Sequence, residues 1–281
     1  MRPRLLVAAA ARAACVCVAM LVALFAIPAL AASESLSHDA QREILQKALA
    51  AFDQAVNVAR RDESQAERLY RDAAAGFESL AAAGVRNAAL EYNLGNTFFR
   101  LNDLGRAILH YRRAARLAAP AADLVANLEY ARARVTPQFA PSGESRLFRQ
   151  LFAWHVQTSR MSRLQAAGIA ALIGSAALLL RLRWRNPALA WVAGGALAVA
   201  GLAAGSLVVQ LRDEAAAPPA VVIRADTTLR LGRGEGYDPA LAAPLGAGVE
   251  LRIINERGDW LEIRLPTGVT GWLPAAAVER V

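Results

Sequence analysis

Cysteine is almost absent from this chain. The 281 residues include only Cys15 and Cys17, and both lie in the first apolar stretch near the amino terminus. If that stretch is removed on export, the mature protein has no thiol. It then has no disulfide framework, no thiol nucleophile and no thiolate ligand for a metal.

Sequence motifs of catalysis are missing as well. The chain has no H-E-x-x-H, no G-x-S-x-G elbow and no G-x-x-x-x-G-K phosphate loop. The three histidines, His38, His110 and His155, lie far apart in the sequence, and we expect His110 at the surface of a helix. The glycine-rich segment 232–236 precedes no predicted helix and is interpreted as a flexible loop. We therefore expect no enzymatic activity, no catalytic residues, no cofactor and no metal.

The chain carries an excess of positive charge, a formal net charge of +8. Much of this excess flanks apolar runs, and the remainder is spread along the sequence. Lipid head groups explain it more simply than the phosphate backbone of a nucleic acid, so no nucleic-acid partner is expected. The arginines next to apolar runs are Arg2, Arg4, Arg12, Arg181, Arg183 and Arg185.

The amino terminus has the features of a secretory signal peptide. Arg2 and Arg4 precede an apolar stretch over 13–27, and Ala29-Leu30-Ala31 matches an A-x-A cleavage site. We predict a signal peptide over residues 1–31. The alternative is an uncleaved first membrane span, and both interpretations export the residues that follow.

Two long apolar runs follow one another, at 164–182 and 188–211, with an arginine-rich turn at 183–187 between them. Runs of this length can cross a bilayer as helices, so we predict a transmembrane hairpin. Lys and Arg favour the cytoplasmic side, which places the turn inside and both flanking regions in the periplasm of a bacterial inner membrane. Further arginines before the first run weaken this count, and the predicted signal peptide decides the orientation.

Small residues recur four positions apart in both runs. Such spacing lets helices approach closely in lipid, and we attribute it to packing within the hairpin. Contact with a helix of another protein is the alternative. The spaced residues are Ala170 and Gly174 in the first run, and Gly194 with Ala198 and Gly201 with Gly205 in the second.

Residues 38–135 have helical periodicity and contain a 34-residue unit over 88–121. Small residues fall where two antiparallel helices would touch, and large ones fall beside that contact, which is the tetratricopeptide pattern. We expect helices over 38–60, 64–82, 88–101, 104–118 and 121–134, or two repeat units with a closing helix. The residues that carry the pattern are Leu94, Gly95, Phe98, Ala107, Tyr111 and Ala114.

Five side chains of this region are predicted to line a groove for a peptide or partner protein. Amide side chains can bind a peptide backbone through both donor and acceptor, and an arginine can bind a carboxylate. The alternative is that these are ordinary repeat residues on a solvated face. They are Tyr92, Asn93, Asn96, Arg100 and Asn127.

Residues 136–163 connect this region to the first apolar run. Pro137, Pro141 and Gly143 indicate a linker. Apolar residues at helical spacing over 147–155 indicate a helix that lies at the membrane surface.

The periodicity changes to two in the last part of the chain. Strands are predicted over 220–224, 249–254, 260–265 and 271–274, with turns between them. Their order, with Ala247-Gly248, Gly258-Asp259-Trp260 and Gly271-Trp272, resembles bacterial SH3-like domains. The resemblance implies an all-β barrel over 218–281 that can bind cell-wall peptides. It makes Gly258, Trp260, Gly268, Gly271 and Trp272 structural residues.

The order of all these segments resembles the BatE proteins of the aerotolerance (Bat) operons, and the block from Gly95 to Ala114 carries the resemblance together with that order. The sequence departs from the repeat pattern of this family in three places. Arg61 and Glu129 stand where the repeat has glycine, and Pro120 falls one position later than the usual proline that ends a unit. The resemblance implies a multi-domain, non-enzymatic membrane scaffold for protein–protein interactions in oxidative or envelope stress response. Implied partners are Bat proteins with von Willebrand A domains and a MoxR-type ATPase. The alternative function is a sensor or tether that binds peptidoglycan through the SH3-like domain.

Overall fold

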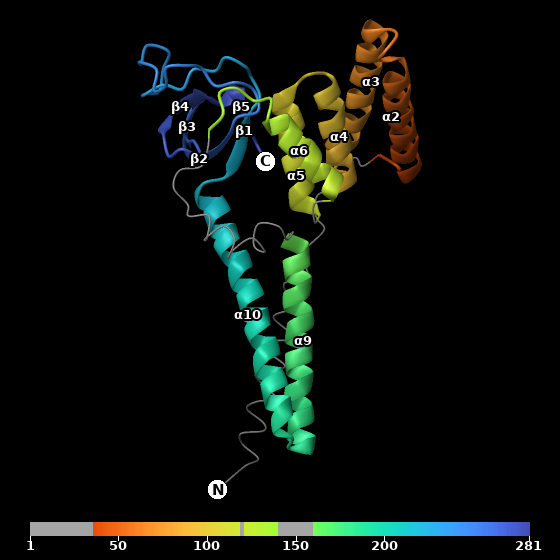
Figure 1. The fold of residues 1–281 in the computed structure, drawn as a ribbon, viewed down its shortest axis with the longest axis vertical. Helices are drawn as coiled ribbons and strands as arrows, with labels where there is room; N and C mark the ends of the chain where they lie inside the picture. The colour runs from red at the N-terminus through yellow and green to blue at the C-terminus, as the bar shows by residue number, and fades with distance from the viewer. Residues whose placement is uncertain (1–35, 119–120, 140–159) are drawn as a thin grey trace. The chain divides into compact units, whose positions relative to one another are not determined.

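The computed structural model describes residues 36–118, 121–139 and 160–281 (Figure 1). The predicted signal peptide and the predicted helix over 147–155 lie outside these residues. The described residues belong to two compact units. One unit is Gly168–Ala200, and the other combines the described parts of Leu36–Ala167 with Gly201–Val281.

Five helices form the first region, which we call the helical region. They pair in sequence order, α2 with α3 and α4 with α5, and α6 packs on α5 (Figure 1). Their starts and ends lie within two residues of the predicted ones. The helices are α2 (His38–Val58), α3 (Glu63–Ala82), α4 (Ala88–Arg100), α5 (Leu104–Leu117) and α6 (Ala122–Arg132).

Side-chain caps explain why four of these helices begin where they do. A side-chain oxygen of the residue before the helix accepts a hydrogen bond from a backbone N–H in the first turn, which otherwise has no partner. The capping residues are Ser37, Asp62, Asn87 and Asp103.

The contact between α4 and α5 has the size pattern that the sequence predicts. A Cβ on Gly95 would lie 2.5 Å from Cδ1 of Tyr111, so only glycine leaves room for this ring. Ala107 and Ala114 are fully buried beside it. The residues that carry the 34-residue pattern therefore form the core of this helix pair.

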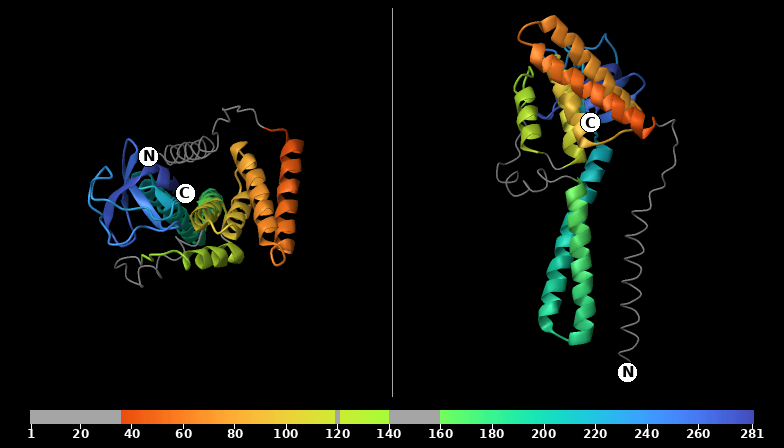
Figure 2. Two further views of the ribbon diagram at one scale, coloured as in Figure 1. Left: turned by 90° about the horizontal axis from the view of Figure 1, so that it is seen from above. Right: turned by 90° about the vertical axis from the view of Figure 1, so that its right-hand side faces the viewer.

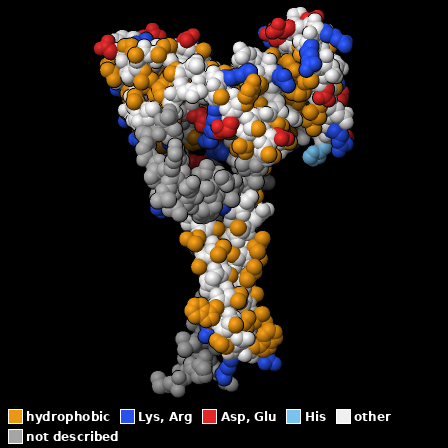
Figure 3. Space-filling model, viewed as in Figure 1, with side chains coloured by type: hydrophobic (Ala, Val, Ile, Leu, Met, Phe, Trp, Pro, Cys, Tyr) orange, Lys and Arg blue, Asp and Glu red, His pale blue; other side chains and the backbone are white. Residues whose placement is uncertain are grey.

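Two longer helices follow, α9 (Arg160–Trp184) and α10 (Pro187–Ala216). Both are long and apolar enough to cross a membrane, and only 17% and 11% of their most apolar stretches are buried. Figure 3 shows mostly hydrophobic side chains on their visible face, with basic side chains near the turn that joins them. In that turn Arg185 has a φ of 49°, and the side chain of Asn186 accepts a hydrogen bond from the N–H of Ala188 at 2.9 Å.

Small residues explain the packing of this hairpin only in part. Ala170 is buried, and a Cβ on Gly174 would lie 2.8 Å from Cγ of Leu197. In contrast, a Cβ added to Gly194, Gly201 or Gly205 would have no described atom within 4 Å. The prediction that hairpin packing explains the glycines of the second run is therefore wrong. Successive positions of a helix point about 100° apart, so Gly194 faces away from the contact that buries its neighbour Ala193.

The C-terminal part, drawn in blue in Figure 2, is called the sheet region. It is a five-stranded antiparallel sheet with the strand order β4-β3-β2-β1-β5, and Figure 1 labels its strands. Gly258 and Gly268 have φ values of 59° and 91°, a conformation that glycine adopts without strain in the turns between strands. The segment 232–236 lies in a loop. The strands are β1 (Pro219–Val222), β2 (Glu250–Arg257), β3 (Trp260–Arg264), β4 (Thr270–Pro274) and β5 (Val278–Arg280).

One hydrophobic core extends from the helical region into the sheet region. The two regions are predicted as separate domains, whereas the structure packs α5 against β1. A Cβ on Gly105 would lie 2.8 Å from the carbonyl oxygen of Val222, and one on Gly248 would lie 2.7 Å from Cγ2 of Val135. At Gly105 backbone meets backbone, and at Gly248 the backbone meets side chains of the helical region, so both glycines allow the two regions to pack closely.

Candidate binding groove

A cavity of about 630 Å³ lies on the helical region, and we call it the groove. Three of the residues predicted for a binding groove, Asn96, Arg100 and Asn127, line it. It has three aromatic rings besides Tyr111 and no acidic side chain. The complete lining is Phe52, Asn96, Phe99, Arg100, Asn102, Tyr111, Asn127, Tyr130 and Arg134.

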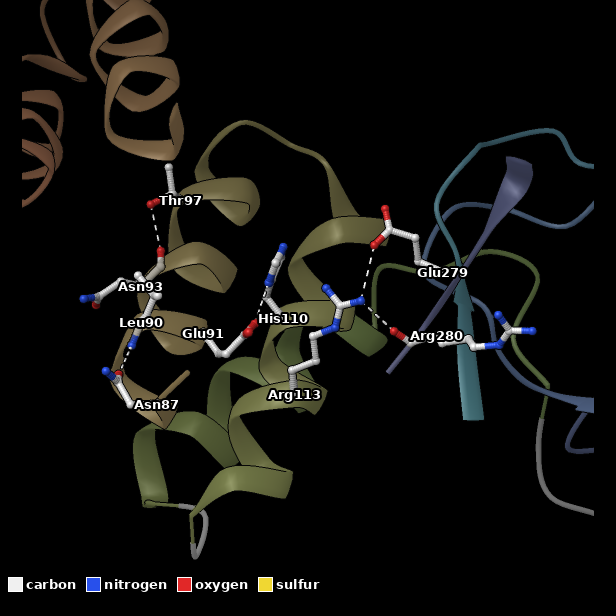
Figure 4. Close-up of polar contacts among 9 residues, drawn as sticks. All are labelled: Asn87, Leu90, Glu91, Asn93, Thr97, His110, Arg113, Glu279 and Arg280. Atoms are coloured by element: carbon white, nitrogen blue, oxygen red, sulfur yellow. Dashed lines mark hydrogen bonds and ion pairs between the residues drawn. The ribbon is translucent and has the colours of Figure 1, made fainter. Parts of the chain in front are cut away.

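The other two predicted groove residues do not line the cavity. The hydroxyl oxygen of Tyr92 accepts a hydrogen bond from Nδ2 of Asn127 at 3.0 Å, so Tyr92 supports the groove from behind. The carbonyl oxygen of Asn93 accepts one from Oγ1 of Thr97 at 2.7 Å. Figure 4 shows the Asn93 side chain pointing away from His110, and Asn93 joins none of the groove contacts.

Hydrogen bonds within the groove orient its two amide side chains. Oδ1 of Asn96 accepts from the hydroxyl of Tyr111 at 2.8 Å and from Nδ2 of Asn127 at 3.1 Å. Within the described part of the chain, Nδ2 of Asn96 and Oδ1 of Asn127 have no partner. The groove therefore presents one amide donor and one amide acceptor, the pair that a peptide backbone requires.

Tyr111 remains a neutral donor in this network. Burial raises the pKa of its hydroxyl above the usual value, and Tyr92 adds to that increase while Arg100 opposes it. Only 1% of Tyr111 is exposed, so its hydrogen bond to Asn96 is shielded from water. This bond fixes the amide orientation just described.

Two arginines give the groove a positive charge. The guanidinium of Arg134 lies 5.0 Å from the ring centre of Phe99 and 4.6 Å from that of Tyr130, and it donates to the Tyr130 hydroxyl at 2.7 Å. Neither Arg100 nor Arg134 forms an ion pair with any carboxylate among the described residues. An anionic group would therefore find two available cations here.

The sequence interpretation gave Tyr111 a structural role only. It missed five further residues of the groove, namely Phe52, Phe99, Asn102, Tyr130 and Arg134. A signal for two of them exists in the 34-residue period, because Tyr130 follows Asn96 and Arg134 follows Arg100 by that interval. Phe52 lies on α2, which carries no clear repeat pattern. Phe99 adjoins the core residue Phe98 and gives no separate signal.

His110 is buried, so the prediction that it lies at the surface is wrong. Its Nδ1 lies 2.7 Å from Oε2 of Glu91, and the ring stacks on Phe98 with 5.4 Å between ring centres (Figure 4). Only 8% of the residue is exposed. The pair joins α4 to α5, and Glu91 supplies the hydrogen-bond partner that a buried imidazole needs.

The residues predicted as structural in the sheet region lie in its turns and strands. Gly258 and Gly268 occupy turns, and Trp260 and Trp272 lie half-buried on β3 and β4. A Cβ on Gly271 would lie 2.7 Å from Cγ of Leu229, so this glycine allows close packing of the preceding loop. None of the five lines the groove.

The side chains that line the groove are polar, aromatic and cationic. It contains amides, phenols, phenyl rings and guanidinium groups, and no carboxylate, imidazole or thiol lines it. Among the residues that the structure describes, no group of His, Cys, Asp or Glu is placed to hold a metal ion. Comparisons of the chain with protein-family models, with curated proteins and with solved structures find no match.

Proposed function

We propose that this protein is a non-enzymatic membrane scaffold that binds segments of partner proteins in the groove of its helical region. The composition of the groove carries this proposal. Asn96 and Asn127 offer a donor and an acceptor to a peptide backbone. Arg100 and Arg134 offer charge-assisted hydrogen bonds to a carboxylate, and the aromatic rings offer apolar contact.

We further propose that the helical region is a tetratricopeptide repeat domain and that the sheet region is an SH3-like barrel. The packing of Gly95 under Tyr111 and the 34-residue interval between groove residues support the first assignment. The succession of antiparallel strands, with glycines at positive φ between β2 and β3 and after β3, supports the second. Neither assignment is needed for the groove itself to bind a peptide.

On this proposal the protein belongs with the BatE-like proteins of aerotolerance operons. The α9–α10 hairpin anchors it in the inner membrane, and the helical and sheet regions lie in the periplasm. Its partners are then Bat proteins with von Willebrand A domains, in an oxidative or envelope stress system that includes a MoxR-type ATPase.

Affinity purification of the full chain from gently solubilised membranes tests this function. Proteins that co-purify with the wild type are identified by mass spectrometry and compared with those from Arg100→Ala. Arg100 is exposed, so its loss leaves the fold intact, and recovery of a groove ligand falls about tenfold, the effect of one lost charge-assisted hydrogen bond. Arg86→Ala removes the same charge at an exposed site outside the groove and retains the partners.

Equal recovery of every partner with both variants contradicts the proposal. Retention of the wild type on purified peptidoglycan, unchanged by Arg100→Ala, favours instead the cell-wall tether. The two functions are thus separated with one pair of variants.

A further inference from the structure

A second cavity, of about 700 Å³, lies where the helical region meets the sheet region, and we call it the cleft. The turn between α4 and α5 and the segment after α6 form one wall. Two loops of the sheet region form the other. The lining comprises Asn102, Asp103, Leu104, Arg134, Thr136, Pro137, Ile223, Ala225, Asp226, Ala243, Pro244, Gly246 and Ala247.

The groove and the cleft adjoin each other. Asn102 and Arg134 line both of them. Arg134 presents its aromatic-stacked guanidinium to the groove, and both residues are exposed. A ligand in the groove that extends past Arg134 therefore enters the cleft.

The sheet side of the cleft is held firmly against the helices. Gly246 has no space for a Cβ beside the carbonyl oxygen of Thr136. Arg132 binds Glu250 through two hydrogen bonds, of 2.8 and 3.1 Å. Nη2 of Arg113 donates to the carbonyl oxygen of Arg280 at 2.6 Å, a contact drawn in Figure 4. These contacts hold the strands of the sheet region, and the loop at Gly246, against the helices, which lowers the cost of ordering on binding.

The charges along this combined surface change sign. The groove carries Arg100 and Arg134, whereas the cleft adds Asp103 and Asp226. Asp103 also caps α5 and lies 3.6 Å from Nε of Arg106. Asp226 is exposed and forms no ion pair with any residue for which the structure gives a position. The surface is therefore cationic at the groove and anionic at the cleft.

We propose that the groove and the cleft form one binding surface for a single extended peptide segment of a partner protein. The segment places an acidic residue against Arg100 and Arg134 and a basic residue near Asp226. This inference rests on the proposed function and adds the sheet region as a second contributor to the site. Charge complementarity selects the orientation of the peptide.

A library of random twelve-residue peptides, displayed on phage and selected on the full chain in lipid nanodiscs, tests this surface. Empty nanodiscs remove lipid binders. The best peptide is synthesised with a fluorophore, and its Kd is measured by fluorescence anisotropy. We expect selected peptides to contain an acidic and a basic residue separated along the segment.

Three variants divide the surface. Arg100→Ala alters only the groove, Asp226→Asn only the cleft, and Arg134→Ala both. The first two each weaken binding about tenfold, and Arg134→Ala weakens it further. Ala243→Trp, at an exposed position of the cleft wall, blocks the peptide sterically. Controls that remove a charge at exposed sites outside both cavities, Arg86→Ala and Asp72→Asn, retain the wild-type Kd.

The outcomes separate this inference from the proposed function. If Arg100→Ala weakens binding while Asp226→Asn and Ala243→Trp do not, the groove acts alone and the combined surface is refuted, although the proposed function stands. If no selected peptide depends on Arg100, both fail. Thermal unfolding of each variant at the wild-type midpoint excludes misfolding as the cause.

Discussion

The α4–α5 pair and the α9–α10 pair are both helix pairs with a glycine at their contact, but they bury opposite kinds of side chain. Between α4 and α5, Gly95 makes room for the large ring of Tyr111, which is 1% exposed. Between α9 and α10 the buried apolar side chains are small, such as that of Ala170, and the large apolar side chains point outward. Trp191, for example, is 85% exposed.

The difference agrees with the solvents that the proposed function assigns to the two pairs, water for α4–α5 and lipid for α9–α10. In water, burying large apolar side chains drives packing, so a helix pair hides its rings. In lipid this drive is absent, and helices associate through close contact of small residues while large apolar side chains face the acyl chains. Gly95 therefore makes room for an aromatic ring in one pair, whereas Gly174 allows the two helices to approach closely in the other.

Removal of the ring tests the water-adapted pair and has the largest expected effect. Tyr111→Ala leaves a cavity in the α4–α5 core and is expected to destabilise the helical region by about 3–5 kcal/mol. Urea unfolding of the full chain in detergent micelles, followed by circular dichroism, measures this loss. Tyr111→Phe keeps the ring and removes only the bond to Asn96, so its effect is about 1 kcal/mol. Equal effects of the two substitutions would show that the ring does not carry the packing.

Replacing two glycines of the hairpin by leucine sharpens the comparison, with a smaller expected change in stability than Tyr111→Ala. Gly174→Leu forces a side chain against Leu197 and is expected to cost about 1–3 kcal/mol through overpacking. A Cβ added at Gly201 would meet no described atom within 4 Å, and Gly201→Leu carries the same gain in helix propensity, which makes it the matched control. Resistance of each variant to unfolding by dodecyl sulfate in mixed micelles gives the measurement. A larger loss at Gly201 than at Gly174 contradicts the packing seen in α9–α10.

Local patterns predicted the elements of this chain because the causes of those elements are local. Caps such as Asp62 and Asn87 lie next to the helices they begin, and Gly258 lies within the turn it permits. The joining of the helical and sheet regions has no local cause. Gly246 and Gly248 have the sequence appearance of a turn, and nothing nearby indicates that α5 and Val135 press against them.

The repeat unit predicted only the groove residues that lie within it or one interval after it. Asn96, Arg100 and Asn127 follow from the 34-residue unit, and the same interval leads to Tyr130 and Arg134. The cleft could not be predicted in this way, because its first wall comes from residues 102–137 and its second from loops at 223–226 and 243–247, which belong to no common repeat. A repeat period in the sequence identifies residues on the surface that the repeats form. It does not identify contacts between the helical region and the sheet region.

The residues that cap the helices extend the comparison to side-chain charge, and here the expected change in stability is the smallest. In the helical region the ionised carboxylate of Asp62 caps α3, whereas the neutral amide of Asn186 caps the start of α10. The hydrogen bonds from the N–H of Gln65 and the hydroxyl of Ser64 lower the pKa of Asp62 below its usual 3.8. A folded-state pKa below the unfolded one adds stability that is fully present above the unfolded value and disappears as pH falls through the folded value.

The wild type should therefore lose slightly more stability between neutral pH and about pH 2.5 than Asp62→Asn, which retains a capping side chain without a titrating group. Unfolding midpoints of both proteins across this pH range measure the difference. Asp72→Asn, at an exposed aspartate that caps no helix, serves as the control for the loss of a negative charge. A difference between wild type and Asp62→Asn that stays constant across the range would mean that the charge of Asp62 does not strengthen the cap.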